Sequence, residues 1–257
     1  MSDDRRLPLE GVWNFRDIGG YGAADGREVR RGVVFRSSRL SEITDGDRDR
    51  LAALGISTIC DLRRQDERTR APSRLDFADD PQVVHLPPTT PATAGFRRLL
   101  AAGEKRVGPY RELIVQSYRE LARDNHTVWS AVVRAILEAP GATVLHCNAG
   151  QDRTGIAVAV VLLALGVARE EVVADYCLTA GYGPPPDAER MYERMRAAGL
   201  DPPEPAALIE ILAPTADLIG TFLETVEQDH SSLETYLTRA LGVSDGELTA
   251  LRARLLG

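Results

Sequence analysis

The sequence contains few of the residues on which disulfide-stabilised and metal-binding proteins depend. Only three cysteines occur in 257 residues, at positions 60, 147 and 177, and they form no Cys-x-x-Cys pair. This spacing excludes a disulfide framework and fits a reducing compartment, so we expect the protein in the cytoplasm. The four histidines show no metal-ligand spacing. We therefore predict neither a metal site nor a cofactor.

Long apolar runs and an excess of basic charge are also missing. The longest apolar run, Ile156 to Val167, is shorter than the stretch of about 20 residues that a membrane-spanning helix needs. The residues Met1 to Arg6 are not followed by an apolar core, so we expect no signal peptide. The net charge is −7, with basic and acidic residues interspersed, which argues against a nucleic-acid partner. An ordinary globular protein without a membrane span remains.

The most informative stretch runs from Val144 to Gly155 and reads Val-Leu-His-Cys-Asn-Ala-Gly-Gln-Asp-Arg-Thr-Gly. The β-branched run Ala142 to Leu145 predicts a buried strand, and the run Thr154 to Leu165, which has no helix breaker, predicts a buried helix. The loop between them begins with Cys147 and ends with Arg153. Such a loop can surround a tetrahedral anion, because its backbone N–H groups and the start of the helix both favour negative charge.

The two residues at the ends of this loop suit phosphate chemistry. Arg153 can donate two parallel hydrogen bonds to phosphate oxygens. Cys147 would lie at the floor of the loop, where positive surroundings favour the thiolate that a nucleophile requires.

The loop resembles the phosphate-binding loop of the cysteine-dependent protein tyrosine phosphatase superfamily, which reads His-Cys, five residues, Arg and then Thr. Asp152 directly before the arginine narrows the resemblance to the atypical bacterial tyrosine phosphatases, which also act on phosphoserine, phosphothreonine or phosphoinositides. That group usually has lysine where this chain has Gln151. Two further blocks, Asn14 to Gly20 and Gly55 to Arg63, support the match, which spans residues 14 to 166.

The resemblance implies an α/β fold in which a small, mostly parallel sheet is flanked by helices, with an extra helical segment at the C-terminal end. The order of the sequence patterns agrees, because strand patterns alternate with helix patterns up to the loop and only helix patterns follow Gly166. We expect one phosphatase domain over residues 1–257. The predicted strands are 33–36, 56–62, 83–86 and 142–145, and the two predicted capping boxes are Thr44 with Asp47 and Ser244 with Glu247.

Two segments leave alternatives open. The paired helices within residues 181–213 lie between proline-rich breaks and would form either a mobile lid over the site or a fixed cap, and family members carry helical insertions of this kind. The segment Thr89 to Val107 combines turn residues with a basic cluster, and it would be either a substrate-facing segment or a solvated face. The cluster consists of Arg97, Arg98, Lys105 and Arg106.

The resemblance also implies a mechanism. Cys147 would attack phosphorus in line and form a thiophosphate that water then hydrolyses. Arg153 and the loop N–H groups would hold the phosphate oxygens. Thr154 would donate a hydrogen bond to the sulfur, and His146 would orient the loop by bonding to the backbone. The residues of the phosphate-binding loop are Asn148, Ala149, Gly150, Gln151 and Thr154.

The leaving group needs a proton, and two aspartates are candidates for the general acid. Many relatives place this aspartate some distance before the cysteine, but no aspartate occurs between Pro81 and Arg123. Asp152 in the loop and Asp61 at the end of a predicted strand remain. Asp152 has the better claim because it lies within the loop, although it would alternatively brace the loop by accepting backbone N–H bonds.

Other residues have structural and functional interpretations. Arg16 and Asp17 match charged residues of the N-terminal block, and a structural ion pair between them is favoured over a catalytic role. The side chains of Arg36 and Arg39 are expected to face substrate. Cys60 would either protect Cys147 by a reversible disulfide or fill the core, and the core is favoured. Cys177 is interpreted as a core residue.

These residues favour a cytoplasmic phosphatase whose partner is a phosphorylated protein or a small phosphomonoester of the phosphotyrosine type. One alternative is a phosphoinositide or inositol phosphate phosphatase, which Gln151 makes less favoured because it removes a positive charge. Another is a non-catalytic phosphate-binding module. An arsenate reductase would need resolving cysteines that the chain does not clearly offer. The sequence leaves the oligomeric state open.

Overall fold

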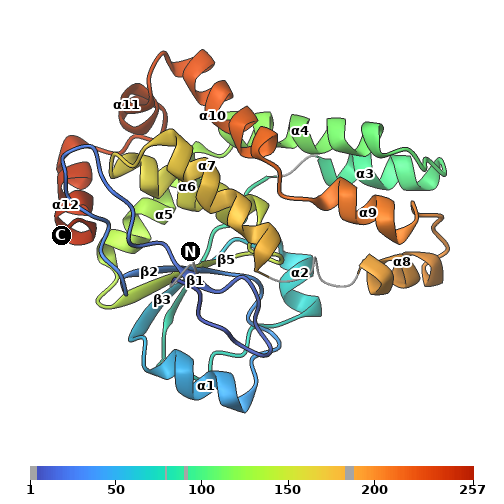
Figure 1. Cartoon of the computed structure of the whole chain (residues 1–257), viewed down its shortest axis with the longest axis horizontal. Coiled ribbons are helices and arrows are strands. Elements are labelled where there is room, and N and C mark those ends of the chain that lie inside the picture. The colour runs from blue at the N-terminus through green and yellow to red at the C-terminus, as the bar shows by residue number, and fades with distance from the viewer. Residues whose placement is uncertain (1–4, 79, 90–91, 183–187) are drawn as a thin grey trace.

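A five-stranded sheet with the order β1-β2-β5-β3-β4 forms the centre of the molecule (Figure 1). The computed structural model describes residues 5–78, 80–89, 92–182 and 188–257. Within these residues β1 runs antiparallel to β2, and the other neighbouring strands are parallel. The predicted small, mostly parallel sheet is confirmed. The strands are β1 (Arg16–Asp17), β2 (Val34–Ser37), β3 (Ile56–Asp61), β4 (Gln82–His85) and β5 (Ala142–His146).

Helices cover both faces of this sheet, which is why the central strand β5 is buried along its whole length. Alternate residues of the strands point to opposite faces. Leu145 and Cys60 belong to the larger hydrophobic cluster beneath α5 (His126–Glu138) and α6 (Asp152–Ala164). Val144 and Ile59 belong to a second cluster that also contains Leu51 of α1 (Asp45–Ala52).

Apart from α3, the remaining helices agree closely with the periodicity of the sequence, and both predicted capping boxes are present, at Thr44 and at Ser244. The residues after α11 form a short π-helical turn, Tyr236–Ala240. The other helices are α2 (Gln65–Arg70), α3 (Ala92–Ala101), α4 (Val107–Arg123), α7 (Arg169–Cys177), α8 (Ala188–Ala197), α9 (Pro205–Leu212), α10 (Ala216–His230), α11 (Leu233–Thr235) and α12 (Asp245–Leu255).

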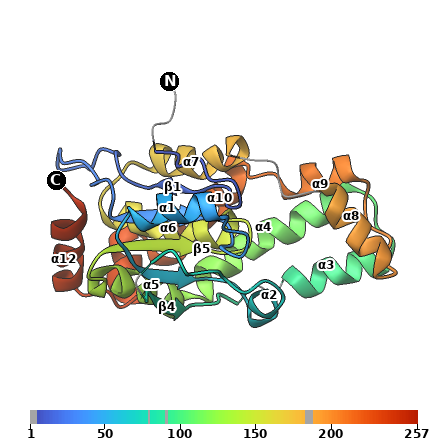
Figure 2. The ribbon, with the colours of Figure 1, turned by 90° about the horizontal axis from the view of Figure 1, so that it is seen from below.

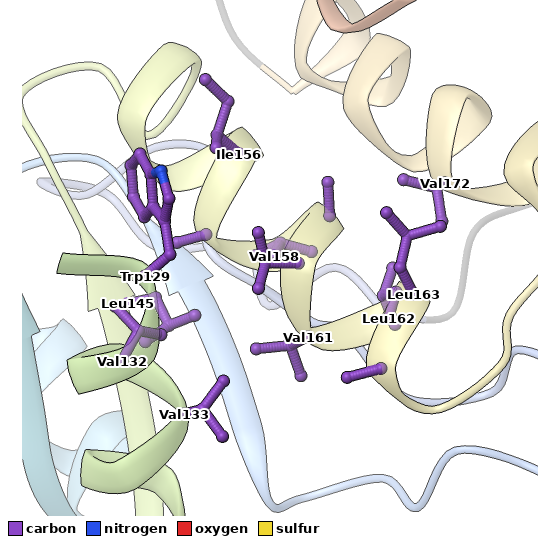
Figure 3. Close-up of a cluster of buried hydrophobic side chains, with 14 of the residues drawn as sticks. Trp129, Val132, Val133, Leu145, Ile156, Val158, Val161, Leu162, Leu163 and Val172 are labelled. Carbon is purple, nitrogen blue, oxygen red and sulfur yellow. The ribbon is translucent and has the colours of Figure 1, made fainter. Parts of the chain in front are cut away.

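Helix α6 is buried on every side from Thr154 to Ala164, so it needs no polar face. Its side chains Ile156, Val158 and Val161 lie between helix α5, strand β5 and helix α7 (Figure 3). This packing fixes the N-terminal end of α6 directly after the C-terminal end of β5. A loop between these two ends therefore has both of its anchors held in the core.

A smaller group of helices extends to one side of the body (Figures 1 and 2). It consists of α3, the first part of α4, α8 and α9, which share a third hydrophobic cluster. The turn residues within 89–107 gave no indication of a helix, but α3 occupies 92–101. Phe96 and Leu100 bury one face of α3 in this cluster, and the Phe96 ring lies 4.7 Å from that of Tyr110. Asp187, where the sequence pattern predicts that a helix begins, lies outside the described residues.

One described helical stretch, Pro205–His230, is long and apolar enough to cross a membrane by length and composition alone. In the structure this stretch is two helices, α9 and α10, separated at residues 213–215. Helix α10 contributes Leu218, Ile219 and Phe222 to the main hydrophobic cluster. The apolar side chains of α10 thus pack in the protein core.

Candidate active site

The loop between β5 and α6 has its carbonyl groups tied to the surrounding protein. The carbonyl oxygens of residues 148–151 all accept hydrogen bonds. Their donors are, in order, the Arg39 N–H at 3.1 Å, the Asn14 side-chain amide at 3.3 Å and 2.9 Å, and the Gly155 N–H at 2.7 Å. Because C=O and N–H of one peptide unit point in opposite directions, the N–H groups of residues 149–152 face away from these partners.

These N–H groups are free for a ligand. Among the described residues, no N–H group from 148 to 153 donates a hydrogen bond to another protein group. Unpaired backbone donors are rare in folded proteins unless water or a ligand satisfies them. A ring of such donors at the start of a helix is the arrangement that binds a phosphate or sulfate ion. The loop therefore has the backbone geometry that the prediction requires, and anion binding itself stays a prediction.

Gly150 allows the loop to approach strand β2 closely. Its φ angle is +65°, in the left-handed region that favours glycine. A Cβ atom at this position would lie 2.4 Å from the carbonyl oxygen of Ser37. No other residue fits there without moving the backbone of β2.

A buried network behind the loop holds the carbonyl groups in place. Arg36 donates to the carbonyl oxygen of Gly150 at 2.8 Å, and its guanidinium pairs with Asp175 of α7. Arg16 pairs with the same carboxylate, 3.4 Å from Nε to Oδ1, and also bonds to the Asn14 side chain. Burial raises the pKa of Asp175, but the two arginines outweigh burial and hold this pKa below its usual value.

This network corrects two predictions. Arg16 does not pair with Asp17, whose carboxylate instead accepts the N–H groups of Gly19 and Gly32 at 2.7 and 2.5 Å. Burial, with the neighbouring charge of Arg36, lowers the pKa of Arg16 to about 10. Arg36 does not face substrate, because it is 0% exposed. Both arginines support the loop from behind.

Cys147 and Arg153 occupy the two ends of the loop, as predicted from their spacing. Cys147 is 2% exposed at the end of β5. Arg153 donates to both carboxylate oxygens of Glu67, at 2.6 and 2.9 Å, and to the carbonyl oxygen of Leu62 at 3.1 Å. Its Nε makes no hydrogen bond within the described part of the chain, so one edge of the guanidinium is left for an anion. Burial lowers the pKa of Arg153, but the charges of Cys147 and Glu67 raise it above its usual value.

Glu67 is one of the site residues that the sequence did not reveal. It lies in the charged helix α2, where its neighbours predict only a solvated surface. The pairing with Arg153 joins residues 86 positions apart, and no local pattern in the sequence signals it. Glu67 orients the guanidinium toward the loop in the same way that an outer carboxylate orients a catalytic histidine.

His146 and Thr154 are both buried next to the cysteine. The ring of His146 donates from Nδ1 to the carbonyl oxygen of Cys147 at 3.3 Å, which is the expected type of hydrogen bond to the backbone. Burial lowers the pKa of His146 to about 4, so the ring is neutral at pH 7. The hydrogen bond expected from Thr154 to the sulfur is not formed, because the Thr154 hydroxyl is buried without a partner in the described residues.

The two candidate acids differ sharply in their surroundings. Asp61 accepts from the buried Arg63 guanidinium at 2.9 Å. Burial raises the pKa of Asp61, but the bonds from Arg63 outweigh burial and keep this pKa below its usual value, so Asp61 has no proton to donate. Asp152 is the first residue of α6, and its Oδ1 accepts from the Tyr118 hydroxyl at 2.6 Å. It accepts no backbone N–H among the described groups, which does not support the bracing role.

Comparison with known proteins assigns the chain. A model of the tyrosine phosphatase family matches residues 7–257. The chain belongs to the tyrosine phosphatase family. The triple specificity protein phosphatase PtpB of Mycobacterium tuberculosis is 31% identical over 281 aligned residues, which cover 98% of this chain and 99% of that protein. A tyrosine-protein phosphatase of Nostoc commune is 29% identical and covers 87% of this chain and 74% of that protein.

These relatives support phosphatase activity, as the loop residues predicted, and they leave the non-catalytic binding module without support. A solved structure of TpbA from P. aeruginosa is 16% identical with a TM-score of 0.32, covering 78% of this chain and 90% of that one. At that distance the likeness adds nothing to the assignment.

Two cavities in this phosphatase border the loop. One, of about 660 Å³, is lined by Asn148 together with Arg39, Arg64, Arg70 and Arg194. The other, of about 640 Å³, reaches Gln151 and Asp152 and is lined mostly by apolar side chains, together with Arg64, Arg70 and Arg97. The apolar lining includes Phe96, Leu100, Ile114, Ile211 and Leu218. Residues near the end of α8, such as Met195, line both cavities.

The helical segment that was predicted as a lid or cap contacts the loop directly. The side-chain amide of Gln151 donates to the carbonyl oxygen of Leu212 at 2.9 Å, where α9 ends. Arg111 of α4 holds the following turn by donating to the carbonyl oxygen of Ala213 at 3.1 Å. The segment therefore covers the loop in this structure, and its mobility stays a prediction.

The four basic residues of the cluster within 97–106 have different surroundings. Arg97 and Arg98 are both exposed, and of the two only Arg97 lines the apolar cavity. Lys105 pairs with Asp201 at 2.6 Å, and Arg106 pairs with Glu104 at 2.6 Å. Of the four basic residues, Arg97 borders this cavity, and its contact with substrate stays a prediction.

The other two cysteines lie away from the loop's interior. Cys60 is 0% exposed in β3, where burial raises the pKa of its thiol to about 12. It pairs in register with Leu145, two residues before Cys147. This placement fits a core residue, and a disulfide with Cys147 stays a prediction. Cys177 is half-buried at the edge of the core.

Proposed function

We propose that this enzyme hydrolyses phosphotyrosine and similar aryl phosphomonoesters through a phosphocysteine intermediate on Cys147. The observation that carries the proposal is the ring of unpaired N–H groups from 148 to 153, with a buried thiol at one end and Arg153 at the other. This arrangement places a nucleophile beneath a bound PO₃ group. It also supplies donors for the charge that redistributes over the equatorial oxygens in the transition state.

The reaction proceeds in two displacements. The Cys147 thiolate forms an S–P bond while the P–O bond to the leaving group breaks, and Asp152 gives its proton to the departing oxygen. Water then attacks phosphorus, the S–P bond breaks, and the water proton passes to Asp152. Inorganic phosphate leaves, and both the thiolate and the protonated acid are restored. No cofactor enters either step.

The acid role of Asp152 has a specific kinetic signature. Asp152→Asn should lower kcat/KM for phosphotyrosine or phenyl phosphate by about 10²–10³-fold, because these leaving groups depend on protonation. The loss on p-nitrophenyl phosphate should be far smaller, because its leaving group is stable as an anion. Phosphate release from both substrates gives the comparison. Equal losses on the two would remove the acid role from Asp152.

The linings of the two cavities favour aryl phosphates over phosphoinositides as substrates. The apolar cavity next to Asp152 suits an aromatic ring on the leaving group. Gln151 brings no charge and is bonded to α9. A phosphoinositide or inositol phosphate is the second candidate, supported by the four arginines that line the other cavity. The name of the relative PtpB, a triple specificity protein phosphatase, agrees with a broad range of substrates.

A substrate comparison tests this order. We expect kcat/KM for a phosphotyrosine peptide to exceed that for the matching phosphoserine peptide and for a short-chain phosphatidylinositol phosphate by about tenfold or more. Arg194→Ala should weaken only the reaction with the lipid. Arg196→Ala provides the matched control, because Arg196 lies on the same helix but pairs with Asp201 outside the cavity. A higher kcat/KM on the lipid would contradict the phosphotyrosine assignment and favour the second candidate.

A further inference from the structure

We propose that Tyr118 is a positioning residue for the general acid, and that a hydrogen-bond chain from Tyr176 through Tyr118 to Asp152 fixes which carboxyl oxygen delivers the proton. The inference rests on the proposed acid role of Asp152 and extends it to two residues outside the phosphate-binding loop.

The hydrogen-bond chain joins three helices inside the protein. Tyr118 of α4 donates to Asp152 Oδ1 of α6 at 2.6 Å. The hydroxyl of Tyr176 of α7 lies 2.6 Å from that of Tyr118, and the two rings meet edge to face. Both tyrosines are 1% exposed. The two hydroxyls are therefore held to each other and to Asp152, and at the tyrosines little water is available to replace a lost bond.

Which group donates in each of these hydrogen bonds follows from the single proton that each hydroxyl carries. A phenol has one proton, and Tyr118 gives its proton to Asp152. The Tyr176 hydroxyl must therefore donate to the Tyr118 oxygen. Burial, with the nearby charge of Asp152, raises the pKa of both tyrosines, so both hydroxyls keep their protons and act as donors throughout the neutral range. Hydrogen bonds arranged head to tail in this way strengthen one another.

The chain has a consequence for the acid. Asp152 Oδ1 accepts from Tyr118 and, at 3.4 Å, from the Gln151 amide. The transferable proton is then carried by Oδ2, and the carboxyl plane is held by a bond from the protein interior. A carboxyl group free to rotate would present its proton in many orientations, and only some of them reach the leaving oxygen.

The sequence has a residue that makes room for this arrangement. Gly155 follows Thr154 on the first turn of α6, facing the ring of Tyr176. A Cβ atom at this position would lie 2.7 Å from Tyr176 Cδ2. The glycine after Arg-Thr thus lets Tyr176 pack against α6, close enough for its hydroxyl to reach Tyr118. This gives the Thr-Gly pair of the loop a role in the acid chain as well as in the loop itself.

The test is Tyr118→Phe, which removes one oxygen and keeps the ring. We expect kcat/KM for phenyl phosphate to fall about tenfold, because the acid loses its orientation. The fall for p-nitrophenyl phosphate should be several times smaller. Since kcat/KM covers only the steps up to the first phosphoryl transfer, the later role of Asp152 with water does not enter the comparison.

Two further variants separate this role from simple support of the fold. Tyr176→Phe removes the same atom one bond farther from the acid, and it should give the same pattern with a smaller loss. Tyr118→Phe added to Asp152→Asn should cause no further loss on phenyl phosphate, because the group it positions is already gone. Thermal melting of each variant shows whether it is folded.

The outcomes are distinct. Equal losses on the two substrates, no loss at all, or additive losses in the double variant would overturn the positioning role of Tyr118 while leaving Asp152 as the acid. If Asp152→Asn itself affects both substrates equally, the acid assignment fails and this inference fails with it.

Discussion

Replacing Cys147 with serine is expected to lower kcat/KM for p-nitrophenyl phosphate by on the order of 10⁵-fold, as the loss of a catalytic nucleophile does in other enzymes. A serine hydroxyl holds its proton at neutral pH, and His146 is not placed to take it. His146 donates from Nδ1 to a backbone carbonyl oxygen, and its other ring nitrogen, Nε2, faces Asp61, 3.6 Å from Oδ1. The N–H ring and Arg153 are unchanged by the substitution. Cys147→Ser should therefore still bind phosphate or vanadate, which isothermal titration measures.

Cys177→Ser is the matched control for this experiment. Cys177 is a half-buried thiol at the end of α7, outside the loop, and its loss should change kcat/KM less than about twofold. Retention of activity within about tenfold of the wild type by Cys147→Ser would show that the sulfur is not the nucleophile.

The second large effect is expected from Arg153→Lys, which keeps the positive charge but loses the planar fork. An ammonium group cannot hold Glu67 with two bonds and present a second pair of donors to phosphate. We expect kcat to fall by about 10³-fold, because the guanidinium acts on charge that develops in the transition state. The measurement is steady-state hydrolysis of p-nitrophenyl phosphate.

Glu67→Gln serves as the companion variant. It leaves Arg153 in place and removes only the carboxylate that orients it, so a loss of about tenfold is expected. Arg64→Lys, at a neighbouring arginine that lines both cavities without contacting Arg153, should have little effect on this small substrate. A loss for Arg153→Lys no greater than that for Arg64→Lys would contradict the role assigned to Arg153.

The parts of this site that lie close together in the sequence were the parts that could be predicted. Strand β5, the loop and α6 follow one another without interruption, and each has a clear local pattern. The positions of Cys147 and Arg153 follow from that order. Gly150 has a positive φ angle and lies against strand β2 where a Cβ atom would not fit. A glycine at this position therefore indicates a left-handed backbone conformation and a close approach within the loop.

The supporting residues could not be predicted, because each reaches the site from a distant segment. Arg16 and Asp175 are 159 positions apart, and Tyr118 and Asp152 are 34 apart. Nothing in the local pattern around Arg16 distinguishes pairing with Asp17 from pairing with Asp175. The adjacent carboxylate looks the more natural partner until β1 and α7 are brought together. Arg36 was misjudged for the same reason, since its partner Asp175 lies 139 positions away in the sequence.

Helix α3 was missed for a different reason. The residues before it, rich in proline, threonine and glycine, favour turns when judged by composition. The helix forms because Phe96 and Leu100 find an apolar surface on α4 and α9, which are distant in the chain. Tertiary packing thus decides the structure where local preference is weak.

The central claim is that Cys147 forms a covalent bond to phosphorus inside the loop, and rapid acid quenching with ³²P-labelled p-nitrophenyl phosphate tests it most directly. In Asp152→Asn the first step needs no acid with this leaving group, whereas the second step loses its base, so the intermediate should accumulate. We expect label on the peptide that contains Cys147, approaching one phosphate per enzyme. Label on any other residue, or none at any quench time while p-nitrophenol is still released, would contradict it.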